Sequence, residues 1–260
     1  MTPRSRAEIP TARRIVVKVG SSSISGENAD QIAPLVDALA TAHARGAEVV
    51  LVSSGAIATA IPFLSLGGRP TDLATQQAAA AVGQNVLMWR YQTSLDRYGV
   101  LAGQVLLTAG DLEHETPRLN AQRAMDRLLA LRILPIVNEN DTVATHEIRF
   151  GDNDRLAALV AELIGADLLV LLSDVDAMYT RPPHLEGAER IAHVPYGDEL
   201  AGVEIGSVGR AGVGTGGAET KVSAARIAAE AGTAVLITAT TLVDDALAGR
   251  EVGTWFEPAP

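Results

Sequence analysis

Two lysines occupy positions from which they could hold an anion. Lys18 lies between Val17 and Val19 in an apolar run, where a buried ammonium group is costly unless it reaches solvent or a counterion. Lys221 follows a glycine-rich stretch and falls in the first turn of an expected helix. Two cations from distant segments can bracket a phosphoryl group during its transfer, so the pair indicates phosphoryl chemistry. For Lys18, the alternative is a lysine at the end of a strand whose ammonium group reaches solvent.

The glycine-rich stretch, residues 212–217, could bind phosphate. Its letters match G-x-G-x-x-G, but residues 202–210 contain no strand-like run, so a nicotinamide dinucleotide site is not supported. It is not a Walker A loop, because Lys221 comes four positions after Gly217 and Val222 replaces the Ser or Thr that binds magnesium. Glycines that open a helix leave backbone N–H groups to converge on an anion, and the helix dipole favours negative charge. A flexible surface loop is the alternative.

Acids and amides gather in two short segments. Residues 138–141 (Asn-Glu-Asn-Asp) follow an expected strand, and residues 151–154 (Gly-Asp-Asn-Asp) precede an expected helix. A helix cap needs one such residue, and the surplus carboxylates suit binding an ammonium group, orienting lysines or holding Mg²⁺ through water. We expect Asp141 to pair with a substrate amine and Asn138 to bond a carboxylate. An ordinary turn or cap is the alternative for both segments.

Other nucleophiles and metal ligands find little support in the sequence. Ser53, Ser54 and Gly55 do not fit the G-x-S-x-G nucleophile motif, and their small size suits the close approach of a ligand. The five histidines include no H-E-x-x-H metal motif, and we expect them at the surface. The chain has no cysteine, which excludes disulfides, thiolate nucleophiles and cysteine-bound metals. We therefore expect no metal held by a dedicated set of side chains.

Apolar runs of strand length alternate with amphipathic segments of helix length along the chain. Strands are expected over residues 13–19, 48–52, 100–107, 133–137, 168–172, 234–238 and 252–256, and helices over residues 30–45, 72–98, 116–131, 155–164 and 219–231. This alternation predicts an α/β fold with a mostly parallel central sheet and helices on both faces. Because ligands of such sheets bind at the carboxyl ends of the strands, the polar residues that follow each strand mark the expected site.

Length and composition limit the kinds of protein that this chain can be. It has 260 residues, 47% of them hydrophobic, which fits one large globular domain without a linker. Its 21 Lys and Arg against 31 Asp and Glu give a net charge of −10, which argues against nucleic acid as a partner. No apolar stretch is long enough to span a bilayer, and the N-terminus lacks an export signal. We therefore expect a cytoplasmic protein that binds neither membranes nor nucleic acid.

Five segments together carry a resemblance to a known family. They are residues 16–22, 52–58, 138–144, 151–154 and 214–217, the last with Thr220 and Lys221. In this order they closely resemble the amino acid kinase family, and within it the glutamate 5-kinases, over about residues 13 to 256. Five motifs in one order are far more specific than any one of them.

The resemblance implies a three-layer αβα sandwich with a single kinase domain over residues 1–260. It also implies transfer of the γ-phosphoryl group of Mg·ATP to the side-chain carboxylate of L-glutamate, the first step of proline biosynthesis. By motif, Lys18 and Lys221 would neutralise the transferring group and Asp154 would hold the lysines in place. Glutamate would be bound by Ser54, Gly55, Asn138, Asp141, Asp152 and Asn153. The nucleotide would contact Lys18, Ser173, Asp174, Thr215, Gly216, Gly217, Ala218, Glu219, Thr220 and Lys221.

The resemblance also implies partners, and it leaves alternatives open. Members of the family are typically homodimers or homotetramers and many are inhibited by proline, so both properties are expected here. Many also carry a C-terminal PUA domain, which we expect this chain to lack. The open alternatives are a paralogue that phosphorylates a different glutamate-like acid and a non-catalytic sensor of an amino acid or nucleotide. The retained lysines and glutamate motifs weigh against both.

Overall fold

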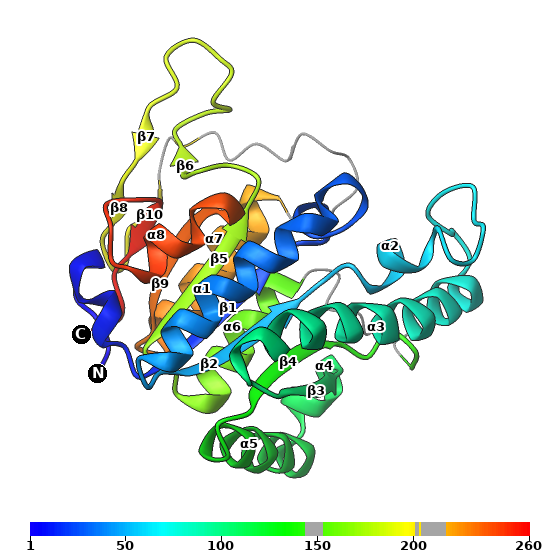
Figure 1. Cartoon of the computed structure of the whole chain (residues 1–260). Helices are drawn as coiled ribbons and strands as arrows, with labels where there is room; N and C mark the ends of the chain where they lie inside the picture. Colours follow the sequence, from blue (N-terminus) through cyan, green and yellow to red (C-terminus); the bar gives the residue numbers. More distant parts are fainter. Residues whose placement is uncertain (144–152, 201–202, 204–216) are drawn as a thin grey trace.

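An eight-stranded sheet forms the centre of the computed structural model, which describes residues 1–143, 153–200, 203 and 217–260 (Figure 1). Its strand order is β3-β4-β2-β1-β5-β9-β10-β8. In that order the strands span Ala102–Leu107, Leu134–Glu139, Glu48–Ser53, Arg14–Val19, Leu168–Ser173, Ala234–Ala239, Thr254–Phe256 and His193–Val194. Neighbours from β3 to β9 are parallel, whereas β10 runs antiparallel to β9. The prediction of a mostly parallel central sheet is confirmed.

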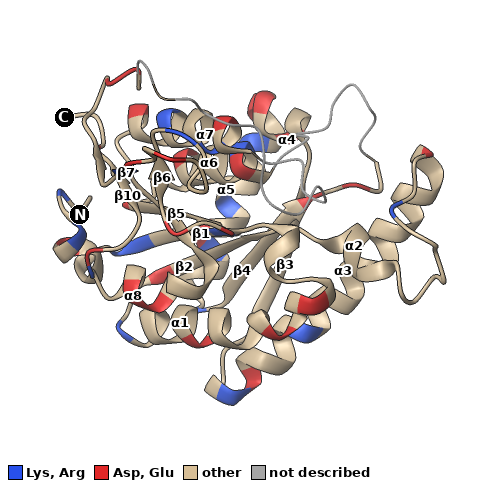
Figure 2. Cartoon of the chain, turned by 90° about the horizontal axis from the view of Figure 1, so that it is seen from above, with Lys and Arg blue, Asp and Glu red and all other residues tan. Residues whose placement is uncertain are grey.

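Helices cover both faces of this sheet, as the alternating pattern predicted (Figure 2). The α-helices are α1 (Ile32–Ala44), α2 (Ala56–Ala60), α3 (Leu73–Leu95), α4 (Ala109–Glu113), α5 (Glu115–Ala130), α6 (Asn153–Ile164), α7 (Ala218–Glu230) and α8 (Val243–Leu247). Short 3-10 turns span Arg6–Thr11, Ser21–Ser23, Gly26–Gln31, Asp96–Tyr98 and Thr240–Leu242. Helices α1, α3 and α8 share one apolar core with the sheet, and α5, α6 and α7 share the other.

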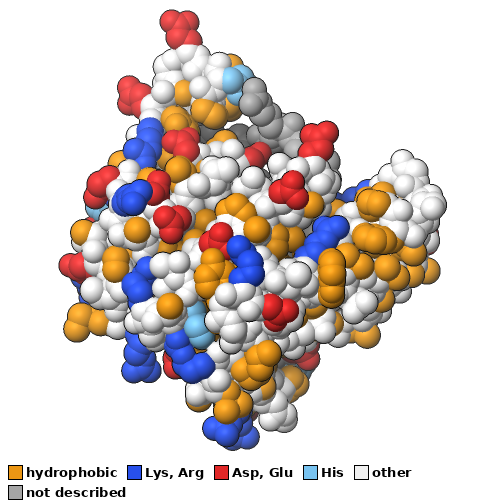
Figure 3. All heavy atoms as spheres, in the orientation of Figure 1, with side chains coloured by type: hydrophobic (Ala, Val, Ile, Leu, Met, Phe, Trp, Pro, Cys, Tyr) orange, Lys and Arg blue, Asp and Glu red, His pale blue; other side chains and the backbone are white. Residues whose placement is uncertain are grey.

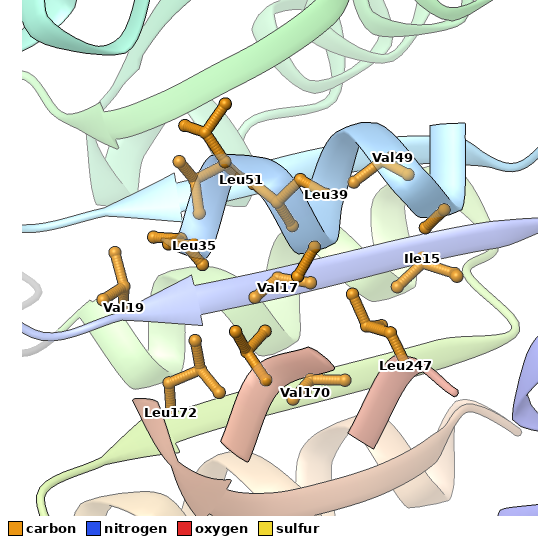
Figure 4. Close-up of a cluster of buried hydrophobic side chains, with 14 of the residues drawn as sticks. Ile15, Val17, Val19, Leu35, Leu39, Val49, Leu51, Val170, Leu172 and Leu247 are labelled. Atoms are coloured by element: carbon orange, nitrogen blue, oxygen red, sulfur yellow. The ribbon is translucent and has the colours of Figure 1, made fainter. Parts of the chain in front are cut away.

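Alternation along β1 assigns its side chains to these two layers. Ile15, Val17 and Val19 pack in the core beneath α1 and α8, while Val16 packs in the core beneath α6 and α7 (Figure 4). Burial of one such aliphatic side chain contributes about 1.5–3 kcal/mol relative to exposure. Because successive side chains of a strand point to opposite faces, Lys18 shares the face of Val16 and therefore lies on the side of α6 and α7.

Several predicted boundaries need correction. The strand expected to end at residue 137 continues to Glu139, because Asn138 and Glu139 pair with Leu106 and Leu107 of β3. Asn138 is therefore part of a strand rather than of the turn after it. The long predicted helix over residues 72–98 ends as an α-helix at Leu95. The short strands β6 (Met178–Tyr179), β7 (Arg190–Ile191) and β8 were not predicted, and β6 and β7 form a separate two-stranded antiparallel sheet.

The histidine prediction is wrong at one position. His43, near the end of α1, is buried, whereas His114, His184 and His193 are exposed as expected. His146 lies outside the described residues. Burial and the neighbouring Arg132 both lower the pKa of His43, which keeps its ring neutral near neutral pH.

Helix α2 and the first half of α3 extend beyond the sheet as an arm (Figure 1). Apolar side chains gather on this arm in the space-filling view (Figure 3), and Phe63, Leu64 and Val82 are among the exposed residues of this part of the chain. Among the described residues, no helix combines the length and the apolar character needed to cross a membrane.

Candidate active site

One carboxylate holds two lysines at the carboxyl edge of the sheet. Oδ1 of Asp154 lies 2.5 Å from Nζ of Lys18, and Oδ2 lies 3.1 Å from Nζ of Lys221. Thr220 also donates its hydroxyl hydrogen bond to Oδ2, at 3.1 Å. All three charged side chains are buried, and Asp154 is completely so. We call Lys18, Asp154 and Lys221 the lysine–aspartate cluster.

Local structure explains why these three residues meet. Lys18 lies near the end of β1 on the face covered by α6 and α7, Asp154 lies in the first turn of α6, and Lys221 lies in the first turn of α7. A carboxylate is favourable in the first turn of a helix because of the helix dipole. The two helices pack against each other, so their first turns meet over the end of β1. The alternative that Lys18 simply reaches solvent is therefore wrong.

The electrostatics of the cluster favour an anion. Its two ammonium groups and one carboxylate sum to a formal charge of +1, held in a buried setting where charge interactions are stronger than in water. A buried charge that loses its partner is strongly destabilising. The ammonium groups are therefore held close to the Asp154 carboxylate, which also balances part of their charge. This arrangement is suited to stabilising negative charge on a transferring phosphoryl group.

The composition of the chain carries a further signal for this cluster. Among the 21 basic residues of the chain, Lys18 and Lys221 are the only lysines, and all the others are arginines. Arginine and lysine are not interchangeable, since the ammonium group is a compact point charge on a flexible stem. Both lysines of the chain meet on one aspartate, which points to a requirement for ammonium groups at this place.

An amide from α6 joins three of the expected substrate-binding segments. The side-chain NH₂ of Asn153 donates to the backbone oxygen of Ser53 at 2.7 Å, to Oγ of Ser54 at 3.0 Å and to Oδ1 of Asn138 at 2.8 Å. The structure thus brings together Ser54, which directly follows β2, Asn138 of β4 and Asn153 of α6. Gly55 follows Ser54 with a φ of +93°, a left-handed conformation that favours glycine.

Helix α3 supports this network with three residues that the sequence analysis did not select. Gln84 accepts a hydrogen bond from Nδ2 of Asn138 at 2.8 Å, and the Tyr91 hydroxyl lies 2.9 Å from Oγ of Ser53. Burial raises the pKa of Tyr91, so its hydroxyl stays neutral. At Gly83, an added Cβ would lie 1.7 Å from the backbone oxygen of Ala56. A polar pair and a glycine on the inward face of an alanine-rich helix could have indicated this contact.

A cavity of about 200 Å³ opens beside the amide network, between α3 and the β3–β4 edge of the sheet. Its walls include Ala56, Gln84, Gln104, Glu139, Asp141 and Thr142. Carboxylates can accept hydrogen bonds from an ammonium group, and the amide of Gln84 can donate to a carboxylate. The cavity thus combines the groups needed to bind a small amino acid.

The expected nucleotide-binding residues lie on the other side of Lys18. Ser173 ends β5, where its Oγ lies 3.2 Å from Oδ1 of Asp174. Oγ1 of Thr220 also lies 2.9 Å from the backbone oxygen of Gly217, so its single hydrogen is shared between this oxygen and Asp154. Ala218 is half-buried, whereas Glu219 is exposed and does not join the lysine–aspartate cluster. Contact of these residues with a nucleotide remains a prediction.

Three predicted site residues, Asp152, Thr215 and Gly216, lie outside the described residues. Within the described part of the chain, no group of three or more histidine, aspartate or glutamate side chains is placed to hold a metal ion.

Comparison with known proteins decides the family. The model of the amino acid kinase family matches residues 13–239. The chain belongs to the amino acid kinase family. It is 77% identical over 259 residues to the glutamate 5-kinase of Leifsonia xyli, covering all of this chain and 96% of that protein. It is 58% identical to the glutamate 5-kinase of Streptomyces avermitilis, covering 98% of this chain and 69% of that protein.

A solved structure of another kinase supports the fold. The carbamate kinase from Giardia lamblia bound to AMP-PNP superposes with a TM-score of 0.70, covering 96% of this chain and 100% of that one. The two sequences are 16% identical, so this likeness concerns the fold alone. The predicted three-layer αβα sandwich of the amino acid kinase family is confirmed.

Proposed function

We propose that this chain transfers the γ-phosphoryl group of ATP to the side-chain carboxylate of L-glutamate, giving L-glutamyl 5-phosphate for proline biosynthesis. The observation that carries the proposal is the lysine–aspartate cluster, in which both lysines of the chain meet on Asp154. The 77% identity to the glutamate 5-kinase of Leifsonia xyli supports the choice of glutamate as acceptor.

The order of the strands supports a division of the site. Strand β1, with Lys18, separates β2 and β4 on one side from β5 and β9 on the other. Ser54 and Asn138 belong to the first side, and Ser173 belongs to the second. We assign the acceptor to the β2–β4 side and the nucleotide to the β5–β9 side. The transferring phosphoryl group then passes over the end of β1, where Lys18 and Lys221 meet.

The proposed reaction asks mainly for positioning and charge stabilisation. A glutamate side chain is ionised at pH 7, so its oxygen can attack phosphorus without a general base. The bond from the γ-phosphorus to the bridging oxygen of ADP breaks as the new bond to the carboxylate oxygen forms, and negative charge spreads over the phosphoryl oxygens. Lys18 and Lys221 offset this charge, and Asp154 holds both ammonium groups in place. Mg²⁺ enters with the nucleotide as part of Mg·ATP.

Two further properties follow from the likeness to glutamate 5-kinases. We propose that proline inhibits the enzyme by occupying the acceptor side, and that the protein forms a homodimer or homotetramer. Inhibition competitive with glutamate supports the first, and unchanged activity at saturating proline rejects it. Light scattering of the purified protein measures the second directly.

A trapping assay tests the activity. Purified protein is incubated with Mg·ATP, L-glutamate and hydroxylamine, which converts an acyl phosphate into a hydroxamate, while ADP release is followed in parallel. D-glutamate, aspartate and N-acetylglutamate serve as comparison acceptors. We expect hydroxamate from L-glutamate at a rate well above that from the other acids. Turnover of a different acid would support a paralogue, and nucleotide binding without any turnover would support a sensor.

A further inference from the structure

Gln84 leaves one polar group unsatisfied at the wall of the cavity. Its side chain is 7% exposed, and its Oε1 atom accepts a hydrogen bond from Asn138 at 2.8 Å. Its Nε2 atom is buried and has no hydrogen-bond partner in the described part of the chain. A buried donor without a partner is unfavourable, and such groups in native proteins call for an explanation such as a ligand.

The orientation of the Gln84 amide is determined by its neighbours. Oδ1 of Asn138 already accepts from the backbone N–H of Glu139 at 2.9 Å and from Nδ2 of Asn153 at 2.8 Å. Asn138 therefore presents its NH₂ group to Gln84, and only the oxygen of Gln84 can accept from it. Turning the amide over would place two NH₂ groups against each other. The unsatisfied N–H groups of Gln84 consequently face away from Asn138.

The place of Gln84 in the site indicates what those N–H groups bind. Gln84 lines the cavity that also contains Glu139 and Asp141. These carboxylates suit an ammonium group, and an amide N–H suits a carboxylate. An amino acid carries both groups on its α-carbon. On the proposed division of the site, the side-chain carboxylate of the acceptor faces Lys18 at β1, so its α-carbon lies farther along, toward β4 and the cavity.

We propose that Nε2 of Gln84 donates a hydrogen bond to the α-carboxylate of the acceptor amino acid, which makes Gln84 a specificity-determining residue. The proposal rests on the proposed function and assigns one further contact within it. Gln84 also acts as a positioning residue, because its Oε1 orients Asn138, which in turn bonds Asn153 and through it Ser54.

The substitution Gln84→Glu separates the two roles. One oxygen of the new carboxylate can still accept the hydrogen bond from Asn138. The other oxygen takes the place of the NH₂ group, so a donor is replaced by a negatively charged acceptor while the side chain keeps nearly the same size. We expect KM for L-glutamate to rise about 10- to 100-fold, as for the loss of a hydrogen bond to a charged group. KM for ATP should change little. The melting temperature should fall, because the new charge is buried near Glu139 and Asp141, so binding is measured well below it. Thr93→Glu, which adds the same charge at an exposed position of α3, is the control.

A substrate analogue tests the same contact without depending on the variant. L-Glutamate α-amide keeps the side-chain carboxylate and replaces the α-carboxylate with a carboxamide. The wild-type enzyme should prefer L-glutamate strongly over this amide. Gln84→Glu should narrow that preference, because the carboxamide N–H can donate to the new carboxylate.

The possible outcomes distinguish the two proposals. If the wild-type protein turns over L-glutamate but does not discriminate against the α-amide, the Gln84 contact is wrong and the proposed function stands. An unchanged KM for L-glutamate in Gln84→Glu would likewise show that the Gln84 contact is wrong, and the proposed function would stand. If the wild-type protein turns over neither acid, the proposed function fails, and calorimetry of L-glutamate binding to wild type and Gln84→Glu then decides the contact separately.

Discussion

The ammonium group of Lys18 lies 2.5 Å from Oδ1 of Asp154, and both side chains are buried. The second oxygen of the carboxylate receives Lys221 and Thr220, so Asp154 is engaged in holding donors on both of its oxygens. Asp154 therefore orients the ammonium groups of Lys18 and Lys221.

Replacing Asp154 with Asn keeps the shape of the side chain and removes its charge. Two buried ammonium groups then lose their shared counterion, so we expect the free energy of unfolding to fall by about 3–5 kcal/mol. The turnover number should fall by about 10²-fold or more, because the lysines lose their fixed positions. Urea unfolding and steady-state kinetics check this prediction. A variant with wild-type stability would show that the carboxylate does not balance the lysines.

Replacing either Lys18 or Lys221 with Met removes one charge-stabilising donor. We expect kcat to fall by about 10²- to 10³-fold for each variant. The variants Lys18→Arg and Lys221→Arg should also have a low kcat, because a planar guanidinium group is larger than the ammonium group that it would replace in this buried cluster. Arg155→Met, which removes an exposed cation next to Asp154, is the control and should keep wild-type turnover. Wild-type turnover by Lys18→Met would reject the assignment.

Amine labelling offers a test specific to this chain. Its amines are the N-terminal group of Met1, which is 91% exposed, and the two buried lysines. We expect reductive methylation to modify the amine of Met1 rapidly and the two lysines slowly. Addition of Mg·ATP should lower the rate of lysine modification further. Digestion followed by mass spectrometry reads each site. Lysine labelling that nucleotide leaves unaffected would contradict placement of the phosphates at the cluster.

Gly83 permits the close approach of α3 to the beginning of α2. In Gly83→Ala, the new methyl group would meet the backbone oxygen of Ala56 at 1.7 Å, so the segment after Ser54 must move. We expect a loss of about 1–3 kcal/mol in stability and a higher KM for glutamate. Gly67→Ala is the control, since an added Cβ there meets nothing within 4 Å. Equal behaviour of the two variants would show that the contact is unimportant.

Asp167 links the beginnings of β1 and β5 in a pH-dependent way. Burial favours its neutral form, but hydrogen bonds from the backbone N–H groups of Arg14 and Arg13 and from the Met1 ammonium outweigh burial, so the pKa of Asp167 is lowered. Because the folded-state pKa is lowered, this stabilisation is complete above the usual carboxyl pKa and is lost as pH falls through the folded value.

The corresponding substitution is Asp167→Asn. We expect it to reduce the free energy of unfolding by about 1–3 kcal/mol at neutral pH. The difference from wild type should shrink as the pH is lowered toward the carboxyl range, as measured by urea unfolding at several pH values. A difference that grows on acidification would contradict the assigned direction.

Local patterns in the sequence were sufficient to predict the architecture and most of the site segments. Period-two and helical patterns depend on local geometry, so they predicted the alternating elements and the parallel sheet, and strand ends marked the edge at which Lys18, Ser54 and Ser173 lie. The five motifs identified the family before any contact was known.

Which side chains meet depends on contacts between segments far apart in the sequence. Strand order and helix packing are long-range, so no local pattern placed Lys18 and Lys221 on the two oxygens of Asp154. The pairing of β4 with β3 drew Asn138 into the sheet. In that position the amide oxygen of Asn138 accepts from Glu139 and Asn153, and its NH₂ group donates to Gln84 of α3. These hydrogen bonds set the direction in which Gln84 presents its own N–H groups.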